Sequence, residues 1–120
     1  MVIASCMTSP AAAGSVEQSL MKLDPEYRAE QACVIKGLDV LRHDARLHSA
    51  DRIKTSIAGP PVLNGLLMTA KGGAVRMNHR WFALPFTCSL TPDFLKATTF
   101  SFELRAEIPK DKWDTYGLWY

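Results

Sequence analysis

The chain has 120 residues, of which 48% are hydrophobic and 22% charged, so it holds enough apolar material for one ordinary globular domain and is not expected to be disordered as a whole. Its net charge of +2 is too small to indicate nucleic acid or a membrane surface as a partner. No apolar run approaches the roughly 20 residues that span a bilayer, so we do not expect a membrane-spanning protein.

The N-terminal residues are mostly small and resemble part of an export signal. Ala-Ala-Ala-Gly at residues 11–14 fits the pattern that a signal peptidase cuts. The apolar stretch before it is short, and no Lys or Arg precedes it. It therefore resembles the last part of a signal peptide, as if the start codon had been assigned too far downstream. Small residues also precede Cys6, which makes Cys6 a candidate lipid anchor, although it lies very close to Met1. A tail without a targeting role is the alternative.

A helix is predicted from Asp24 to about His43. Asp24 suits the position before the first turn, and Pro25 suits the first helical position. Cys33 lies at the flank of the apolar stripe. Gly37 destabilises the helix relative to Ala, so either a neighbouring element approaches closely at this position or the glycine is merely tolerated. The apolar residues that recur at helical spacing are Tyr27, Val34, Leu38 and Leu41.

Short β-strands are predicted after the helix. Residues 53–57 fit a strand by alternation and a helix by the spacing of their two isoleucines, and we favour an edge strand. Residues 66–71 and 74–77 are predicted to pair as a hairpin, with the glycines at 72–73 in a tight turn that needs positive φ. A second turn is predicted at residues 78–79.

Two long strands follow, at residues 80–88 and 97–108. The last strand alternates almost perfectly, with Glu103 and Arg105 on the face toward water. In the first strand, Trp81 lies on the outer face. The residues of that strand that face the core are Phe82, Leu84, Phe86 and Cys88. One wet face indicates an antiparallel sheet that is covered on one side only, and the helix is the element available to cover it.

The sequence therefore predicts an α+β fold. An N-terminal α-helix packs on one face of a 4–5-stranded antiparallel sheet, and a short helical segment follows at residues 110–116. We expect the aromatic residues near the C-terminus to pack back on the domain. Residues 1–19 are predicted to be a flexible or residual signal segment, and residues 20–120 a single domain.

Cys33 and Cys88 are predicted to form a disulfide. Cys88 points to the face that the helix covers, and the helix carries Cys33. Closing a loop of this length stabilises a domain by about 4 kcal/mol in the chain-entropy model. Disulfides persist in oxidising compartments, so together with the signal-like N-terminus the pair predicts a periplasmic or secreted protein. The alternative is two buried free thiols in a cytosolic protein.

Several motifs together resemble the bacterial domain of unknown function 930 family, and the likeness runs from about Leu20 to Tyr120. In chain order they are Lys22-Leu23-Asp24-Pro25-Glu26 with Arg28, Glu30-Gln31 and Cys33, then Asp51-Arg52, Trp81-Phe82 with Phe86-Thr87-Cys88, Thr91-Pro92-Asp93, Phe100-Ser101-Phe102, and Glu107-Ile108-Pro109 with Trp113. Members of that family are similar in being small bacterial proteins, usually with an export signal. The resemblance implies no activity, substrate or catalytic residue, and the abbreviated signal region departs from it.

Residues able to carry chemistry are few. His43 and His48 lie near the predicted helix end, where a surface position is favoured over a metal site, so we predict neither a metal nor a cofactor. One combination of a nucleophile with a general base is worth considering, Cys88 with His79. An oxidised Cys88, however, cannot act as a nucleophile. Glu103 belongs to a charged, solvated strand face, where cross-strand pairing is favoured over a carboxylate site.

Two functions are consistent with these features. The favoured one is a non-catalytic binding or interaction module of the bacterial envelope, with an envelope protein or another envelope component as its partner. Trp81, Glu103 and Arg105 on the outer sheet face are then the candidate binding surface, with Trp81 as an anchor. The alternative is a small hydrolase that uses Cys88 or a strand carboxylate.

Overall fold

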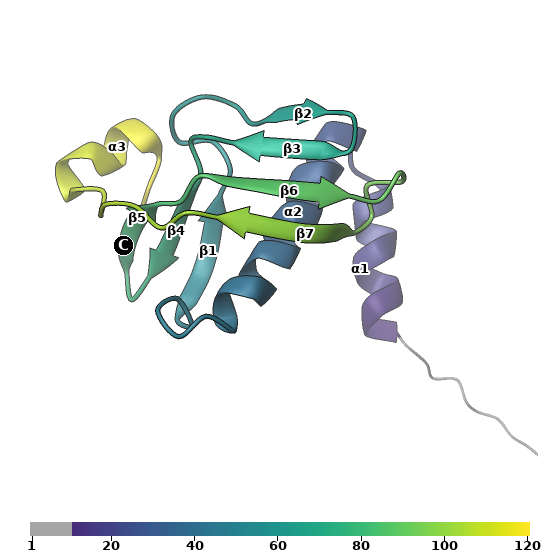
Figure 1. Ribbon diagram of the computed structural model, residues 1–120, viewed down its shortest axis with the longest axis horizontal. Coiled ribbons are helices and arrows are strands. Elements are labelled where there is room, and N and C mark those ends of the chain that lie inside the picture. Colours follow the sequence, from purple (N-terminus) through teal and green to yellow (C-terminus); the bar gives the residue numbers. More distant parts are fainter. Residues whose placement is uncertain (1–10) are drawn as a thin grey trace, which may run out of the picture.

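A computed structural model describes residues 11–120, with side chains described from Val16 onward (Figure 1). Two helices open the described part, α1 (Ala11–Met21) and α2 (Pro25–Arg42). Seven strands follow: β1 (Ala50–Lys54), β2 (Val62–Asn64), β3 (Leu67–Ala70), β4 (Ala74–Met77), β5 (Arg80–Ala83), β6 (Phe86–Leu90) and β7 (Ala97–Phe102). The 3-10 turn η1 (Lys110–Lys112) and α3 (Trp113–Tyr116) complete the fold, so the predicted α+β class and C-terminal helical segment are confirmed.

The strands form two antiparallel sheets instead of the single sheet of four or five strands that the sequence predicts. One sheet has the order β1-β4-β5, and the other has the order β2-β3-β6-β7. Helix α2 contacts β1, β3, β6 and β7, and Figure 1 shows it behind β6 and β7 and alongside β1. The opposite face of the four-stranded sheet, toward the viewer in Figure 1, carries no helix in the described part of the chain.

The predicted strand at residues 80–88 is divided into β5 and β6 by a bend at Pro85. Pro85 has no N–H to donate, and the N–H of Leu84 donates to the carbonyl of Gly73 instead of to a strand neighbour (2.8 Å). The N–H of Glu103 donates to the carbonyl of Pro85 (3.0 Å), so the chain after β7 follows the bend. The last strand region thereby runs from the four-stranded sheet to the side of β5 and joins the two sheets.

The predicted hairpin turn at the glycine pair is wrong. Strands β3 and β4 belong to different sheets, and neither Gly72 nor Gly73 has a positive φ. These positions are crowded: a Cβ at Gly72 would lie 2.9 Å from the backbone nitrogen of Ala58, and one at Gly73 would overlap the carbonyl oxygen of Leu84. The glycines therefore let the chain cross from one sheet to the other where backbones approach closely.

The hairpin turns lie elsewhere. Gly65 adopts a positive φ of 64° in the turn that joins β2 to β3. Asn78 and His79, with φ values of 53° and 62°, form the two-residue turn between β4 and β5, as predicted. Strand β1 is an edge strand, also as predicted, although it covers Ala50–Lys54 and ends before Ile57.

Most of the buried side chains by which helix α2 packs on the sheets are small. Its buried residues are Ala29, Ala32, Cys33, Gly37 and Leu41. Cys33 thus lies in the centre of the buried stripe and not at its flank, and Tyr27 is half exposed, which corrects two predictions. A Cβ at Gly37 would lie 2.6 Å from the ring of Phe100, so the close neighbour that this glycine requires is the core of the four-stranded sheet.

The three-stranded sheet is covered on both faces. By strand alternation, Val75 of β4 faces the main core under α2, while Ala74 faces a second cluster with Trp81 of β5. The C-terminal residues Trp113 and Leu118 complete that cluster, which confirms that the aromatic C-terminal segment packs back on the domain. Trp81 is fully buried (0% exposed), so the prediction of an exposed Trp81 on the outer face is wrong. Alternation assigned its face correctly, but the C-terminal segment covers that face.

The N-terminal predictions fall partly outside the described residues. Cys6, the candidate lipid anchor, lies outside the described residues, as does the start of the signal-like stretch. Residues 11–19, which were predicted to belong to a flexible or residual signal segment, form most of α1, and α1 continues past the predicted domain start at residue 20.

Within residues 11–120, no helix is both long and apolar enough to cross a membrane.

Candidate functional site

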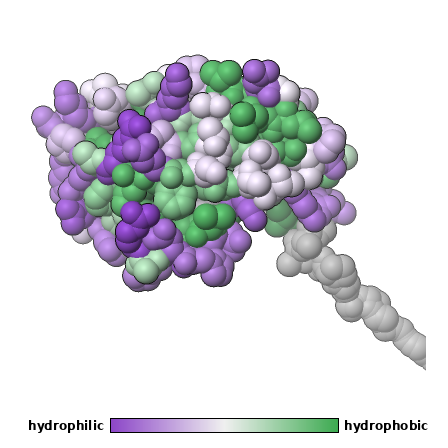
Figure 2. Space-filling model, in the orientation of Figure 1, coloured by the Kyte–Doolittle hydropathy of each residue, from purple (hydrophilic) through white to green (hydrophobic). Residues whose placement is uncertain are grey.

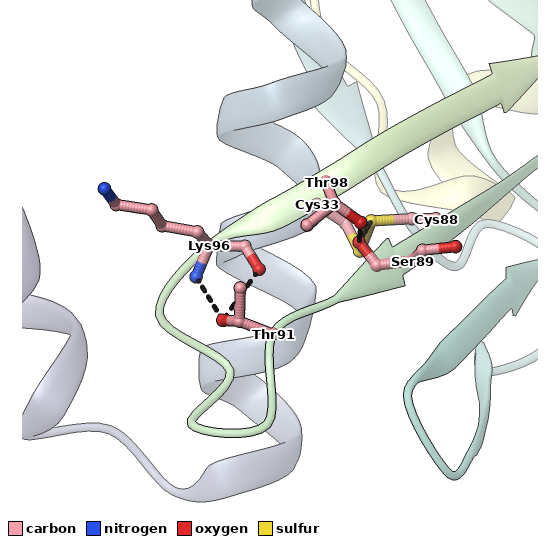
Figure 3. Close-up of a disulfide and its surroundings, with 6 residues drawn as sticks. All are labelled: Cys33, Cys88, Ser89, Thr91, Lys96 and Thr98. Atoms are coloured by element: carbon pink, nitrogen blue, oxygen red, sulfur yellow. Dashed lines mark hydrogen bonds between the residues drawn. A yellow bond between two sulfur atoms is a disulfide. The ribbon is translucent and has the colours of Figure 1, made fainter.

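The two cysteines that are predicted from the sequence to form a disulfide lie together beneath α2. Their Cα atoms are 5.9 Å apart, within the usual range of a disulfide, and both side chains are fully buried. Figure 3 shows Cys33 on the helix and Cys88 on β6 joined through their sulfur atoms. In this arrangement Cys88 has no free thiolate and no path to solvent, so it cannot serve as a nucleophile.

The histidines lie apart from this pair. His79 occupies the exposed turn between β4 and β5, where its ring stacks on Tyr120 with centroids 4.5 Å apart, whereas Cys88 lies in the other sheet under α2. His43 follows the last residue of α2 and its Nδ1 lies 2.7 Å from the carbonyl oxygen of Asp39. Among the residues that the structure describes, no three His, Cys, Asp or Glu side chains converge on a common point.

The outer face of the four-stranded sheet brings Glu103 and Arg105 together. Nη2 of Arg105 donates to Oε1 of Glu103 (2.9 Å), and both side chains are well exposed. They border a shallow hollow of about 260 Å³, whose polar lining includes Thr69, Lys71, Thr87 and Ser101. Trp81 does not contribute to this hollow. Of the predicted binding surface, two residues thus lie side by side on an open face and the third lies in the core.

A larger hollow, which we call the α2–β7 groove, was missed from the sequence. It measures about 530 Å³ and lies between α1, α2 and the start of β7. Its apolar lining is Val16, Ala32, Ile35, Leu95 and Ala97. Its charged lining is Glu17, Lys36, Asp39, Arg42 and Lys96. The one available signal was Ile35, an apolar residue off the predicted buried stripe that is 48% exposed in the structure.

Arg28 of α2 links the elements that line this groove. Its Nε donates to the carbonyl of Leu20 at the end of α1 (3.1 Å), and its Nη1 donates to the carbonyl of Asp93 in the β6–β7 turn (3.0 Å). The hydroxyl of Thr91 and the N–H of Leu95 donate hydrogen bonds to the carboxylate of Asp93. These two hydrogen bonds are the main reason that the pKa of Asp93 is lowered. One guanidinium therefore connects α1, α2 and the turn.

Arg76 of β4 is the most buried charged side chain in the described chain and connects the sheet to the C-terminal segment (9% exposed). Its Nε and Nη2 donate to the two carboxylate oxygens of Asp51 in β1 (3.0 and 2.6 Å). Its Nη1 donates to the main-chain oxygen of Tyr120 (3.3 Å). The hydrogen bonds from Arg76 are the main reason that the pKa of Asp51 is lowered.

The Asp51–Arg76 pair predicts a pH dependence of stability. Because the pKa of Asp51 is lower in the folded state, the pair stabilises the fold above the unfolded pKa of about 4, and this contribution is lost as the pH falls through the folded pKa. We expect the free energy of unfolding of the wild type to fall more steeply between about pH 5 and pH 2 than that of Asp51→Asn. Urea unfolding at successive pH values measures both slopes.

The matched control is Asp114→Asn, which makes the same change at an exposed position where no ion pair is found in the described chain. Its pH profile should follow the wild type. Equal slopes for Asp51→Asn and the wild type would show that the pair does not contribute to acid sensitivity.

Comparison with known proteins gives one match. The model of the family described as Domain of Unknown Function (DUF930) matches residues 20–118. No curated protein and no solved structure matches the chain. The matched range includes α2, both sheets and the Cys33–Cys88 pair, so it covers nearly all of the described fold. The resemblance predicted from the short motifs is confirmed, and the chain belongs to the family described as Domain of Unknown Function (DUF930).

Proposed function

We propose that this domain is a non-catalytic binding module that is exported to the periplasm or beyond and binds a component of the bacterial envelope. The observation that carries the proposal is the fully buried Cys33–Cys88 pair with its disulfide geometry. Structural disulfides persist in oxidising compartments, which supports an extracytoplasmic location. The same pair argues against the version of the hydrolase alternative that uses Cys88, because the oxidised Cys88 has lost its nucleophilic thiol.

The proposed binding surface is the outer face of the four-stranded sheet. The strand register aligns Thr69, Thr87 and Ser101 across β3, β6 and β7, and the Glu103–Arg105 pair borders this row. Figure 2 shows this face, with apolar side chains gathered over the β2–β3 hairpin. The exposed apolar residues of that hairpin are Val62, Leu66 and Leu67. An exposed apolar patch beside hydroxyl and charged groups is typical of a protein-binding surface.

The location is tested by the redox state of the cysteines in cells. Free thiols are alkylated at lysis, before reduction, and the protein from the envelope fraction is weighed by mass spectrometry. We expect Cys33 and Cys88 to escape alkylation and the mass to rise by about 2 Da on reduction. Recovery in the cytosolic fraction with both cysteines alkylated would contradict the proposal.

Binding is tested with a photo-crosslinking amino acid at Ser101, on the proposed surface, and a matched control at exposed His48 beyond the end of α2. We expect covalent adducts in cells from position 101 and none from position 48. Equal labelling at both positions, or none at either, would overturn the proposed surface.

A further inference from the structure

We propose that the free edge of β7 and the α2–β7 groove bind an extended, acidic peptide segment, which adds to the four-stranded sheet as a further strand. The inference goes beyond the proposed function, because it adds a second binding site, separate from the outer face of the sheet, and names the class of its partner. Peptides bind other sheets in this mode through backbone hydrogen bonds along an edge strand and through pockets for alternate side chains.

The backbone of β7 offers a free hydrogen-bonding edge. β7 is the last strand in the order β2-β3-β6-β7. The N–H of Glu103 donates to Pro85, and antiparallel alternation then directs the N–H and C=O groups of Thr99 and Ser101 toward β6. The corresponding groups of Phe100 and Phe102 point away from β6, where the described chain supplies no further strand. These groups are a template for an added strand.

Most of β7 lacks the features that usually protect an edge strand. Natural edge strands are usually blunted by charged residues, prolines or bulges. The segment Ala97–Phe102 contains no charged residue and no proline. Its one register irregularity lies near its start, opposite Ser89 and Leu90, and leaves the stretch from Thr99 onward regular.

The α2–β7 groove begins where this edge begins. Ala97, the first residue of β7, lines the groove together with Ala32 and Ile35 of α2. In Figure 1, α2 runs behind β7 and α1 stands beside the start of the strand, so a segment laid along the edge passes over α2. Every second side chain of that segment would face the helix. The volume of about 530 Å³ accommodates apolar side chains against Ile35, which is half exposed without them.

The charges of the groove favour an acidic segment. Lys96 is paired with Glu17 (3.8 Å). This pairing leaves the cations Lys36 and Arg42 against the single carboxylate of Asp39 in the lining. Lys36 and Arg42 line the groove from α2, and within the described residues neither has an ion-pair partner. A carboxylate of the peptide, from a side chain or from its C-terminus, would complement these two cations.

The test begins with selection from a displayed library of random ten-residue peptides with free C-termini, followed by synthesis of an enriched peptide. Amide hydrogen exchange of the full chain is then measured with and without that peptide. We expect exchange at Phe100 and Phe102 to slow by at least about tenfold on binding, because both amides enter a ladder. Contact through side chains alone would not protect these amides.

Charge and apolar variants test the groove. Lys36→Glu with Arg42→Glu should weaken binding of the same peptide by at least about tenfold, and Ile35→Ser should weaken it as well. Both changes lie at positions that are not fully buried, and circular dichroism checks that the fold is retained. Lys112→Glu, an exposed reversal in η1, is the matched control and should keep the wild-type affinity.

Three results would overturn the inference. The first is that no peptide is enriched. The second is that an enriched peptide binds without protecting Phe100 and Phe102, which leaves the binding module intact if crosslinks form at Ser101. The third is concentration-dependent protection of the same amides in the absence of peptide, together with a dimer in ultracentrifugation. That result assigns the edge to a second copy of this chain.

Discussion

Loss of the Cys33–Cys88 disulfide is expected to lower the free energy of unfolding by about 4 kcal/mol. The bond joins residues 55 positions apart, and the chain-entropy model gives this value for a closed loop of that length. Small domains are stable by only about 5–15 kcal/mol in total, so the loss is a large share of the stability. The pair also joins α2 to β6 within the main hydrophobic core.

Urea unfolding with and without reductant measures the effect, in a chain where Cys6→Ser leaves Cys33 and Cys88 as the only thiol pair. We expect the unfolding midpoint to fall on reduction. The control is the double variant Cys33→Ala/Cys88→Ala, which should unfold at a reduced midpoint that reductant does not change. If the protein that retains Cys33 and Cys88 has the same unfolding midpoint with and without reductant, the disulfide does not stabilise the fold.

Local patterns in the sequence predict most elements of this fold. Asp24 and Pro25 locate the start of α2, and alternation directs Cys88 toward the helix. The same alternation locates β7, although the strand ends at Phe102 and not at residue 108 as predicted. Alternation also places Glu103 and Arg105 on an exposed face. Each of these features depends on neighbours within a few residues, which is the range over which sequence patterns carry information.

The arrangement of strands depends on contacts between distant segments and was not predictable in this way. The hairpin was assigned to the glycine pair at 72–73, whereas the Asn64-Gly65 dipeptide, itself a strong hairpin signal, marks the true hairpin: Asn64 ends β2 and Gly65 begins the turn that joins β2 to β3. The glycine pair instead serves a close approach to Ala58 and Leu84, which no local pattern reveals. Two sheets resulted where one was expected.

The same limit applies to the candidate sites. The α2–β7 groove needs α1, α2 and the β6–β7 turn to be placed together, and Arg28 makes that placement through the carbonyls of Leu20 and Asp93. Backbone carbonyls carry no sequence signature, so these contacts cannot be inferred from residue types. Whether β7 is an edge strand likewise depends on the strand order and not on its own residues.

Replacement of Trp81 by alanine is expected to lower the free energy of unfolding by about 3–5 kcal/mol, the usual cost of removing a large buried aromatic side chain. Trp81 is fully buried, and its Nε1–H donates to the backbone carbonyl of Trp119 (2.7 Å). The two rings also meet edge to face, with centroids 5.2 Å apart. Alanine at this position would leave a cavity and an unpaired carbonyl in the cluster that holds the C-terminal segment.

Two further variants separate packing from hydrogen bonding at this position. Trp81→Phe keeps most of the apolar volume but removes the donor to Trp119, so we expect a smaller loss of about 1–3 kcal/mol. Trp119→Ala, at a side chain that is 44% exposed, should cost less than Trp81→Ala, since its carbonyl remains available to Trp81. Urea unfolding ranks the three variants. If Trp81→Ala were as stable as the wild type, Trp81 would be the surface anchor that strand alternation alone suggests, and the C-terminal cluster would not stabilise the fold.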